Sequence, residues 1–425
     1  MILMDFKEKA RRLDHEDPLA HFRELFFHQP GKIYLEANSL GLLSRPAEEA
    51  VLQILEQWRT LGVEGWLSGQ EPWFFLADKL SELLAPLVGA APQEIGIGDC
   101  TTINLHKLLA TFYQPSTSRS KILIDELAFP SDLYAVQSHL RLRGRDPSHD
   151  LVKVRSSDGY TLSEPEIVAA MTDDVQLAIL PSVLFQSGQL LDIAYLAREA
   201  RVRDVLLGID CSHSVGVVPH HLNDWGIDFA FWCTYKYLNS GPGSVAAWYV
   251  NRQHFGRSPG MMGWFSSRKE TQFDMAEECQ PAQDARCLQV GTPQILSMAP
   301  LAGTLQIAAE AGIERVRHKS LQLTTFLAEL MQSELSSYGF KIVTPPEDER
   351  RGGHLAIAHS EGLRICKCLR EAGVIVDYRP PNLIRFAPSP LATSFGECWQ
   401  AMSRLKAIMA EETYRQYSPD RDLVS

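Results

Sequence analysis

The chain has 425 residues, which is too long for one ordinary hydrophobic core, because chains beyond roughly 250–300 residues usually divide into domains. Hydrophobic residues make up 45% and charged residues 22%, the balance of a globular protein rather than a disordered or fibrous one. Acidic residues outnumber basic ones by 52 to 41, and the formal charge of −11 opposes contact with phosphate backbones, so we expect no nucleic-acid partner.

The eight cysteines include no C-x₂-C doublet of the kind that binds zinc, so we expect free thiols in a reducing compartment and no metal. Charged residues interrupt the apolar N-terminus, which the core of a signal peptide does not tolerate; they are Asp5, Lys7, Glu8, Lys9, Arg11 and Arg12. Nor does the sequence contain an apolar run of about 20 residues that could span a bilayer. We expect a cytoplasmic protein without a membrane partner.

The first predicted elements are helices. After an N-terminal arm, residues 1–43, Ser44 caps a helix whose first turn holds Pro46, and apolar residues then recur at helical spacing up to Trp58. A second amphipathic helix is expected over residues 76–88 and should stop at Gly89.

From there short apolar runs alternate with helical stretches, which indicates a mainly parallel sheet covered by helices on both faces. We therefore predict an α/β domain over residues 44–300. Its seven expected strands are Ile95–Ile97, Lys121–Ile124, Leu151–Val154, Leu177–Leu180, Val205–Ile209, Phe229–Trp232 and Val245–Val250.

The character of the sequence changes near Pro300. A long helix is expected over residues 301–338, followed by shorter strands at 341–343, 355–358 and 383–386 with a helix before the last of them. This pattern predicts a smaller α+β domain over residues 301–425.

The fifth strand ends in Asp210-Cys211-Ser212-His213. Ligands of open α/β sheets bind beyond the carboxyl ends of the strands, so residues directly after strands are candidates for chemistry. A buried acid needs a partner, and a protonated pyridine nitrogen is one that fits, because the carboxylate lets the ring act as an electron sink. A helix cap or a turn residue is the alternative interpretation of Asp210 taken alone.

The sixth strand leads into Thr234-Tyr235-Lys236-Tyr237-Leu238-Asn239 and a glycine-rich turn. A lysine between an apolar strand and such a turn is poorly explained as a solvated charge, and it suits a Schiff base and proton transfer. Lys236 together with Asp210 predicts an enzyme that binds pyridoxal 5′-phosphate.

Two other strand ends offer further cofactor contacts. Cys100-Thr101-Thr102 opens a helix, and helix N-termini present free N–H groups to phosphate, although capping would also explain the threonines. Phe129-Pro130-Ser131-Asp132 places an aromatic ring where it could stack on a flat cofactor, with a plain helix start as the alternative.

Five segments together resemble the kynureninase family in order and spacing. They are Asn38-Ser39-Leu40-Gly41, Phe129-Pro130-Ser131-Asp132, Asp210-Cys211-Ser212-His213, Thr234-Tyr235-Lys236-Tyr237-Leu238-Asn239 and Gly263-Trp264-Phe265. The similarity runs from about residue 30 to about residue 395. It implies fold type I of the pyridoxal-phosphate enzymes, a homodimer with active sites at the subunit interface, and hydrolysis of L-kynurenine to anthranilate and L-alanine in tryptophan degradation.

The resemblance also implies a role for each matching residue. Lys236 would carry the cofactor, and Asp210 would hold its pyridine nitrogen. Tyr235 would hold the phosphate or relay a proton, and Arg385 would bind the substrate carboxylate, with an exposed strand arginine as the alternative. Other cofactor contacts would come from Cys100, Thr101, Phe129, Pro130, Ser131, Asp132, Ser182 and His213, and from Trp264 and Thr292 of the neighbouring subunit.

Two features differ from the family pattern. The family tends to have a hydroxyl where Pro181 stands, so we expect the adjacent Ser182 to take that contact. Members that favour 3-hydroxykynurenine tend to have asparagine at the position of Thr292 and histidine close to Gly62, where this chain has Val63. We therefore expect plain kynurenine to be preferred, with 3-hydroxykynurenine as the alternative substrate.

Cysteine desulfurases and selenocysteine lyases share the Asp-x-x-His and lysine arrangement and form the rival class. Their chemistry needs a nucleophilic cysteine on a mobile loop. Arg351-Gly352-Gly353-His354 resembles the segment that carries this cysteine, but Leu355 follows, and the nearby Cys366 is expected in a helix. A non-catalytic regulator with the same fold would be expected to add a basic helix-turn-helix, and the sequence has none.

Overall fold

A computed structural model describes residues 5–421, so the outermost ends of the predicted arm and C-terminal domain, residues 1–4 and 422–425, lie outside the described residues. Its centre is a seven-stranded sheet in the order β2-β8-β7-β6-β5-β3-β4, in which β8 alone runs against the other strands. The predicted mainly parallel α/β sheet is confirmed. The strands are β2 (Ile95–Gly98), β3 (Lys121–Asp125), β4 (Leu151–Val154), β5 (Val175–Pro181), β6 (Leu206–Asp210), β7 (Phe229–Cys233) and β8 (Ala246–Val250).

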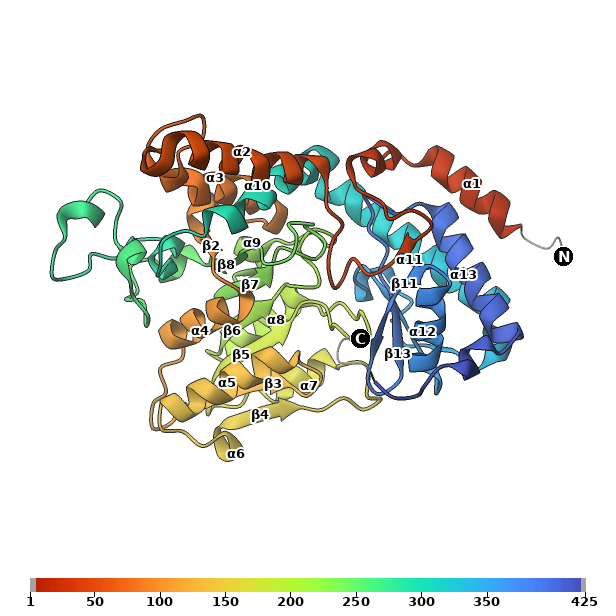
Figure 1. Cartoon of the computed structure of the whole chain (residues 1–425). Helices are drawn as coiled ribbons and strands as arrows, with labels where there is room; N and C mark the ends of the chain where they lie inside the picture. Colours follow the sequence, from red (N-terminus) through yellow and green to blue (C-terminus); the bar gives the residue numbers. More distant parts are fainter. Residues whose placement is uncertain (1–4, 422–425) are drawn as a thin grey trace.

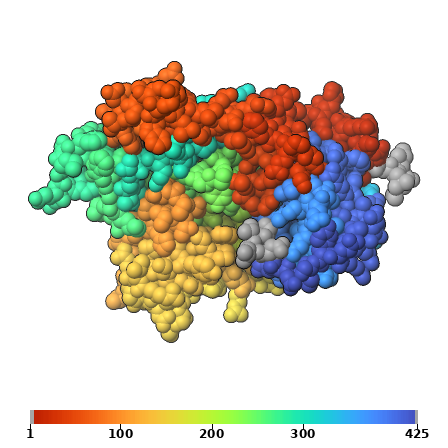
Figure 2. Space-filling view, in the orientation of Figure 1, coloured from red at the N-terminus to blue at the C-terminus, as the bar shows by residue number. Residues whose placement is uncertain are grey.

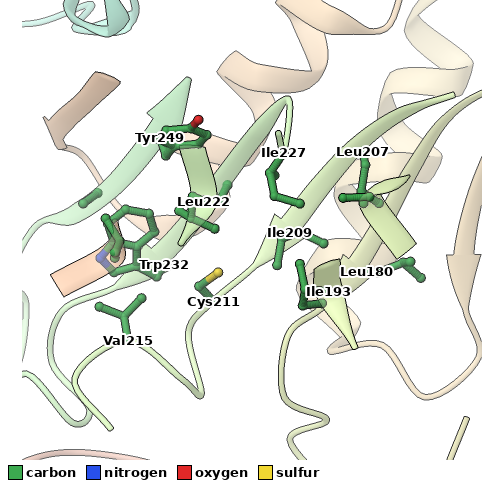
Figure 3. Packing of buried hydrophobic residues seen from close by; sticks show 14 of the residues in the cluster. Leu180, Ile193, Leu207, Ile209, Cys211, Val215, Leu222, Ile227, Trp232 and Tyr249 are labelled. Atoms are coloured by element: carbon green, nitrogen blue, oxygen red, sulfur yellow. The ribbon is translucent and has the colours of Figure 1, made fainter. Parts of the chain in front are cut away.

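Both faces of this sheet are buried, because alternate residues of each strand point to opposite faces. Leu180, Ile209 and Trp232 face one apolar cluster, in which helix residues such as Ile193 pack against them (Figure 3). Ile179 and Phe231, one position away, face a second cluster. The helices that follow the strands are α4 (Thr101–Phe112), α5 (Pro130–Leu142), α6 (Pro147–Asp150), α7 (Glu164–Ala169), α8 (Ile193–Val202) and α9 (Leu222–Trp225).

A smaller α+β part follows, as predicted, and is drawn in blue in Figure 1. Its four antiparallel strands have the order β12-β13-β10-β9. The elements are β9 (Lys341–Ile342), β10 (Leu355–Ala358), α12 (Gly362–Glu371), β11 (Val374–Ile375), β12 (Asp377–Arg379), β13 (Leu383–Phe386) and α13 (Phe395–Ala410). The short strands β11 and β12 were not among the predicted elements.

The N-terminal arm joins this smaller part. Helix α1 (Phe6–Glu16) packs on α13, and strand β1 (Ile33–Tyr34) pairs in parallel with β11. The space-filling view shows the arm, in red, lying against the blue C-terminal residues and reaching the sheet domain (Figure 2). The predicted division of the chain at residues 43 and 300 stays a prediction.

The helices around the sheet correct one expectation. The single helix expected over residues 301–338 is two helices, α10 (Ile295–Ala311) and α11 (Ile313–Glu334), followed by a short turn of helix at Ser336–Tyr338. Gly312 separates them at a φ of 74°, a left-handed value that favours glycine and that a continuous right-handed helix does not allow. Helix α10 therefore starts before Pro300 and packs along α2 (Arg45–Leu61) and α3 (Leu76–Leu84).

The predicted helix boundaries nearby are confirmed. The Ser44 hydroxyl accepts a hydrogen bond from the Ala47 amide at 3.3 Å, and Gly89 ends the turn after α3 in the left-handed conformation. Among residues 5–421, none of the helices combines the length and the apolar character needed to cross a membrane.

The contact between α2 and α10 generates a prediction. A Cβ added at Gly303 would lie 2.1 Å from the Pro46 carbonyl oxygen, so Gly303→Ala forces the two helices apart. Although alanine is the better helix former by about 1 kcal/mol, overpacking costs about 1–3 kcal/mol. The variant should unfold at a lower urea concentration than the wild type.

The matched control is Gly291→Ala, where a Cβ meets no atom within 4 Å. An unfolding midpoint for Gly303→Ala at or above that of the control would contradict the close packing of the two helices.

Candidate active site

A cavity of about 270 Å³ lies at the carboxyl ends of the parallel strands, where the sheet domain meets the smaller one. The pairing of β5 with β6 and of β6 with β7 brings these strand ends together. Ten of the predicted site residues line the cavity: Cys100, Thr101, Phe129, Ser131, Asp132, Asp210, His213, Tyr235, Lys236 and Arg385. They come from the ends of four strands, β2, β3, β6 and β7, and from the smaller sheet.

Lys236 and His213 are in direct contact. The Nζ atom of Lys236 lies 2.9 Å from Nε2 of His213, a residue that is almost fully buried. Burial, and then the charge of Lys236, lower the pKa of His213 well below its usual value, so the ring is neutral. The lysine therefore donates to Nε2, the ring proton sits on Nδ1, and Nδ1 has no partner in the described chain.

Two carboxyl groups meet on the floor of the cavity. Asp132 is buried, and its pKa is raised by burial and then by the charge of Asp210, with which it shares a hydrogen bond. A hydrogen bond between two carboxyl groups needs one proton, and the raised pKa places it on Asp132. Asp210 also accepts a hydrogen bond from the Ser212 amide at 2.8 Å.

The N-terminus of α4 forms one wall. Cys100 is its capping residue, and no side chain satisfies the first free amides of the helix. Thr102 and Ser131 join the starts of α4 and α5 through hydroxyl groups 2.6 Å apart. These free N–H groups and hydroxyls form a donor set suited to an anion.

Behind this wall lies an ion pair between a buried lysine and a half-buried aspartate. Lys107 is fully buried, and its Nζ lies 2.9 Å from the Asp99 carboxylate and 4.0 Å from the centre of the Trp248 ring. Asp99 has a φ of 49°, an uncommon value for a residue other than glycine, and it precedes the capping residue directly. The pair therefore fixes the turn from which α4 starts.

Aromatic rings stand at the mouth of the cavity. Phe129 is 44% exposed, with its ring 5.3 Å from Phe185 in an edge-to-face arrangement. The Nζ atom of Lys236 lies 6.0 Å from the ring centres of both Phe129 and Tyr235. Burial raises the pKa of Tyr235, so its phenol keeps its proton at neutral pH.

Arg385 closes the opposite side. It belongs to β13 and is almost fully buried, so the alternative of an exposed strand arginine is wrong. Its guanidinium bonds Asp377 through two nitrogens, with Nε 2.7 Å from Oδ1, and it donates to the Phe185 carbonyl at 2.5 Å.

Four predicted residues do not line the cavity. Pro130 starts α5. The Ser182 hydroxyl is 2.6 Å from that of Ser214, which in turn lies 2.8 Å from Nε2 of His220, so Ser182 belongs to a buried chain beneath the strand ends. Trp264 and Thr292 are exposed, and their contact with the cofactor of a neighbouring subunit stays a prediction.

Sequence reasoning left several lining residues without a role. These are Asn38, Ser39, Thr102, Phe185, Ser212, Ser244, Ala246 and Arg379. For Arg379 a signal was present, because Asp377 and Arg379 stand two positions apart, the spacing that puts side chains on one face of a strand.

The N-terminal arm approaches the lysine segment at Gly41. Its amide donates to the Tyr235 carbonyl at 2.7 Å, and a Cβ at this position would lie 2.5 Å from the Lys236 carbonyl oxygen. Only glycine fits so close to this backbone.

Cys366, the cysteine considered for desulfurase chemistry, is buried in α12, with its sulfur 3.7 Å from the Asp377 carbonyl oxygen. Burial raises the pKa of its thiol, which disfavours the nucleophilic thiolate. It therefore lacks both the exposure and the mobile loop that this chemistry needs.

Comparison with known proteins gives concordant results. A family model described as the kynureninase C-terminal domain matches residues 316–405. A kynureninase of Geobacillus thermodenitrificans is 53% identical over 418 residues, which cover 98% of each chain. A kynureninase of Bacillus anthracis is 52% identical over 418 residues, again 98% of each chain.

Solved structures share the fold at lower identity. A C-DES variant with glycine covalently linked to its PLP cofactor has a TM-score of 0.79 at 19% identity, covering 90% of this chain and 98% of its own. The Escherichia coli cysteine desulfurase CsdA has a TM-score of 0.76 at 17% identity, covering 93% and 98%. Identities this low establish the fold alone.

The buried histidines near the site predict a pH dependence of stability. Burial lowers the pKa of His220 and of His354 to about 3, whereas an unfolded histidine titrates near about 6.5. Each histidine has a lower pKa in the folded protein than in the unfolded chain. Its contribution to the free energy of unfolding is therefore fully present above the unfolded pKa and is lost as the pH falls toward the folded pKa. From pH 7 to pH 5, the free energy of unfolding should fall by about 2 kcal/mol per histidine.

Urea denaturation at both pH values tests this expectation. His220→Gln should lose one histidine's share of the pH dependence, whereas His149→Gln, at an exposed position, should behave as the wild type does. An unchanged pH dependence in His220→Gln would refute it.

Proposed function

Because the chain belongs to the kynureninase family, we propose that it hydrolyses the bond between the β and γ carbons of L-kynurenine, giving anthranilate and L-alanine, with pyridoxal 5′-phosphate as its cofactor. One observation carries the proposal. A single cavity collects a lysine, a carboxylate at a strand end, an aromatic ring, a helix N-terminus and a buried arginine.

The residues fit this cofactor by their chemistry. Lys236 supplies the amine that binds an aldehyde, and Asp210 supplies a carboxylate for a protonated ring nitrogen. Thr101 and the first amides of α4 suit a phosphate, and Phe129 offers a stacking surface. His213 is buried in the same cavity with Nδ1 unpaired, which leaves one donor for a polar group of the cofactor. When bound, pyridoxal phosphate withdraws electrons from the α-carbon of the substrate.

Lys236 is the residue we propose for moving protons. Its neighbour His213 is neutral and lies 2.9 Å from Nζ, so this contact adds no negative charge that would hold the proton on the amine. In the neutral form, the amine can take the α-proton of the substrate.

Asp210 and Asp132 share one negative charge below the lysine. Such a site neutralises one positive charge, which matches a single protonated ring nitrogen.

Tyr235 supports the hydrolytic step in our proposal. Its raised pKa keeps the phenol protonated, so it can donate a proton where oxyanion or carbanion charge develops in the transition state.

Arg385 binds the substrate carboxylate in this proposal. Asp377, the Phe185 carbonyl and the Ser39 hydroxyl take four of its five N–H groups, so one N–H on Nη1 remains for the substrate carboxylate.

We further propose a homodimer in the cytoplasm. Large apolar side chains are exposed along α2 and the turn after it, which lie at an outer edge of the molecule (Figure 1); they are Leu52, Leu55, Trp58, Val63 and Leu67. Several large apolar side chains exposed on neighbouring segments support a subunit contact. The eight cysteines are all free, which fits a reducing compartment.

The assignment of Lys236 predicts where the cofactor is attached. After incubation with pyridoxal phosphate and reduction with borohydride, mass spectrometry should find the added mass on Lys236 in the wild type and no added mass in Lys236→Ala. Lys153→Ala, at an exposed position on β4, should behave as the wild type does. Covalent cofactor on the Lys236 variant would overturn the assignment.

The ring preference is a second prediction. A site without polar partners for the ring hydroxyl of 3-hydroxykynurenine leaves this group unpaired at a cost of about 1–3 kcal/mol. The kcat/KM for kynurenine should therefore exceed that for the hydroxylated substrate by about ten- to a hundredfold.

Both values should be measured on one enzyme preparation, and Thr292→Asn should narrow the difference. Equal values in the wild type, or a preference for 3-hydroxykynurenine, would reject the role of Thr292.

A further inference from the structure

Three charged residues share one face of the smaller sheet. Strands β12 and β13 are antiparallel, and their register places Asp377 directly opposite Arg385. Arg379 follows Asp377 by two positions and therefore points to the same side of β12. Two arginines thus flank one carboxylate.

Asp377 holds both arginines through ion pairs. Arg385 bonds it through two nitrogens, Arg379 reaches Oδ2 at 2.8 Å, and the Ser39 hydroxyl donates to the same oxygen at 3.1 Å. Asp377 is fully buried and does not line the cavity, whereas both arginines do. The carboxylate is therefore a support behind the guanidinium groups rather than a contact for a ligand.

The charges of this trio do not cancel. Burial favours a protonated Asp377, but the charge and hydrogen bonds of Arg385, and then the charge of Arg379, outweigh it and bring its pKa to about 2. Glu36 makes no ion pair with either arginine in the described chain. Burial, followed by the charge of Asp377, raises its pKa, and the charges of Arg370, Arg385 and Arg379 act in the opposite direction. Two guanidinium groups and one carboxylate leave one positive charge facing the cavity.

We propose that Asp377 determines substrate specificity by leaving the two arginines one net positive charge, enough for one carboxylate and not for two. This inference rests on the proposed function, in which Arg385 takes the α-carboxylate. The α-carboxylate uses the one positive charge that Asp377 leaves uncompensated, so a side chain with an uncharged carbonyl is accepted. The second carboxylate of a dicarboxylic amino acid finds no further uncompensated charge on the two arginines. Asp377 thereby selects monocarboxylic amino acids and also positions Arg385.

The experiment compares two competitive inhibitors of kynurenine hydrolysis, L-alanine with one carboxylate and L-aspartate with two. The variant Asp377→Asn removes the carboxylate that pairs with Arg379, so this arginine can bind a second carboxylate. The ratio of the inhibition constant of L-alanine to that of L-aspartate should therefore rise about tenfold or more, as expected for one added charge contact in a desolvated site. Asp377→Glu, which keeps the charge, should keep the wild-type ratio. The double variant Asp377→Asn with Arg379→Gln should lose the gain.

A merely structural role for Asp377 would weaken both inhibitors alike and leave the ratio unchanged, which would overturn the proposal. Thermal unfolding and cofactor content show whether Asp377→Asn folds. If Asp377→Asn does not fold, the variant Arg379→Gln tests the proposal by itself. Removing the net positive charge should raise the inhibition constant of L-alanine several-fold, and an unchanged constant would overturn the proposal.

The variant Arg385→Lys separates this inference from the function on which it rests. If that variant leaves both the KM for kynurenine and the inhibition by L-alanine unchanged, the assignment of Arg385 under the proposed function fails. If Arg385→Lys impairs both while Asp377→Asn leaves the ratio unchanged, only the role of Asp377 fails.

Discussion

The parallel pairing of β5, β6 and β7 is the constraint on which the site depends. Each strand is buried on both faces, so polar residues can stand only at its ends, and the shared direction brings these ends to one edge. Asp210 and Lys236 are separated in sequence but line one cavity, because the neighbouring parallel strands β6 and β7 end at the same edge of the sheet. The sheet determines where the site lies, and the turns after the strands carry the polar side chains that line it.

At this edge of the sheet, each buried ionisable group has its own partner, and burial and that partner together determine whether the group is charged or neutral. Asp132 is kept neutral next to Asp210, His213 is kept neutral next to Lys236, and Asp377 stays charged because two guanidinium groups surround it. Each case follows from the same competition between the loss of hydration and a specific partner. Neutral and charged forms of similar side chains therefore stand in, and directly behind, a cavity of about 270 Å³.

The sequence predicted the parts of the structure that depend on local pattern. The seven strands were recognisable as apolar runs, and Lys236 and Asp210 were found because strand ends are where such sheets bind ligands. The break at Gly312 was missed because the apolar spacing continues on both sides of the glycine.

Parts that depend on contacts between distant segments were not predictable in the same way. Strand β12 has three residues, two of them charged, so its pattern resembles an exposed turn until its pairing with β13 is known. The direction of the Ser182 hydroxyl depends on Ser214, and nothing in the local sequence around residue 182 specifies that partner. The roles proposed for Trp264 and Thr292 require a second subunit, which a single sequence does not position.

The pairing of β1 with β11 has a consequence for the order of folding. These strands join residues 33–34 to residues 374–375, and the same arm places Gly41 against the backbone of the lysine segment. A chain still emerging from the ribosome lacks β11 until synthesis is nearly complete, so the arm has no strand to pair with before then. Contacts of such large sequence separation form late, because the loop they close is long. The sheet domain can therefore collapse during synthesis, whereas the segment that carries Lys236 reaches its final packing only after the C-terminal strands have been made.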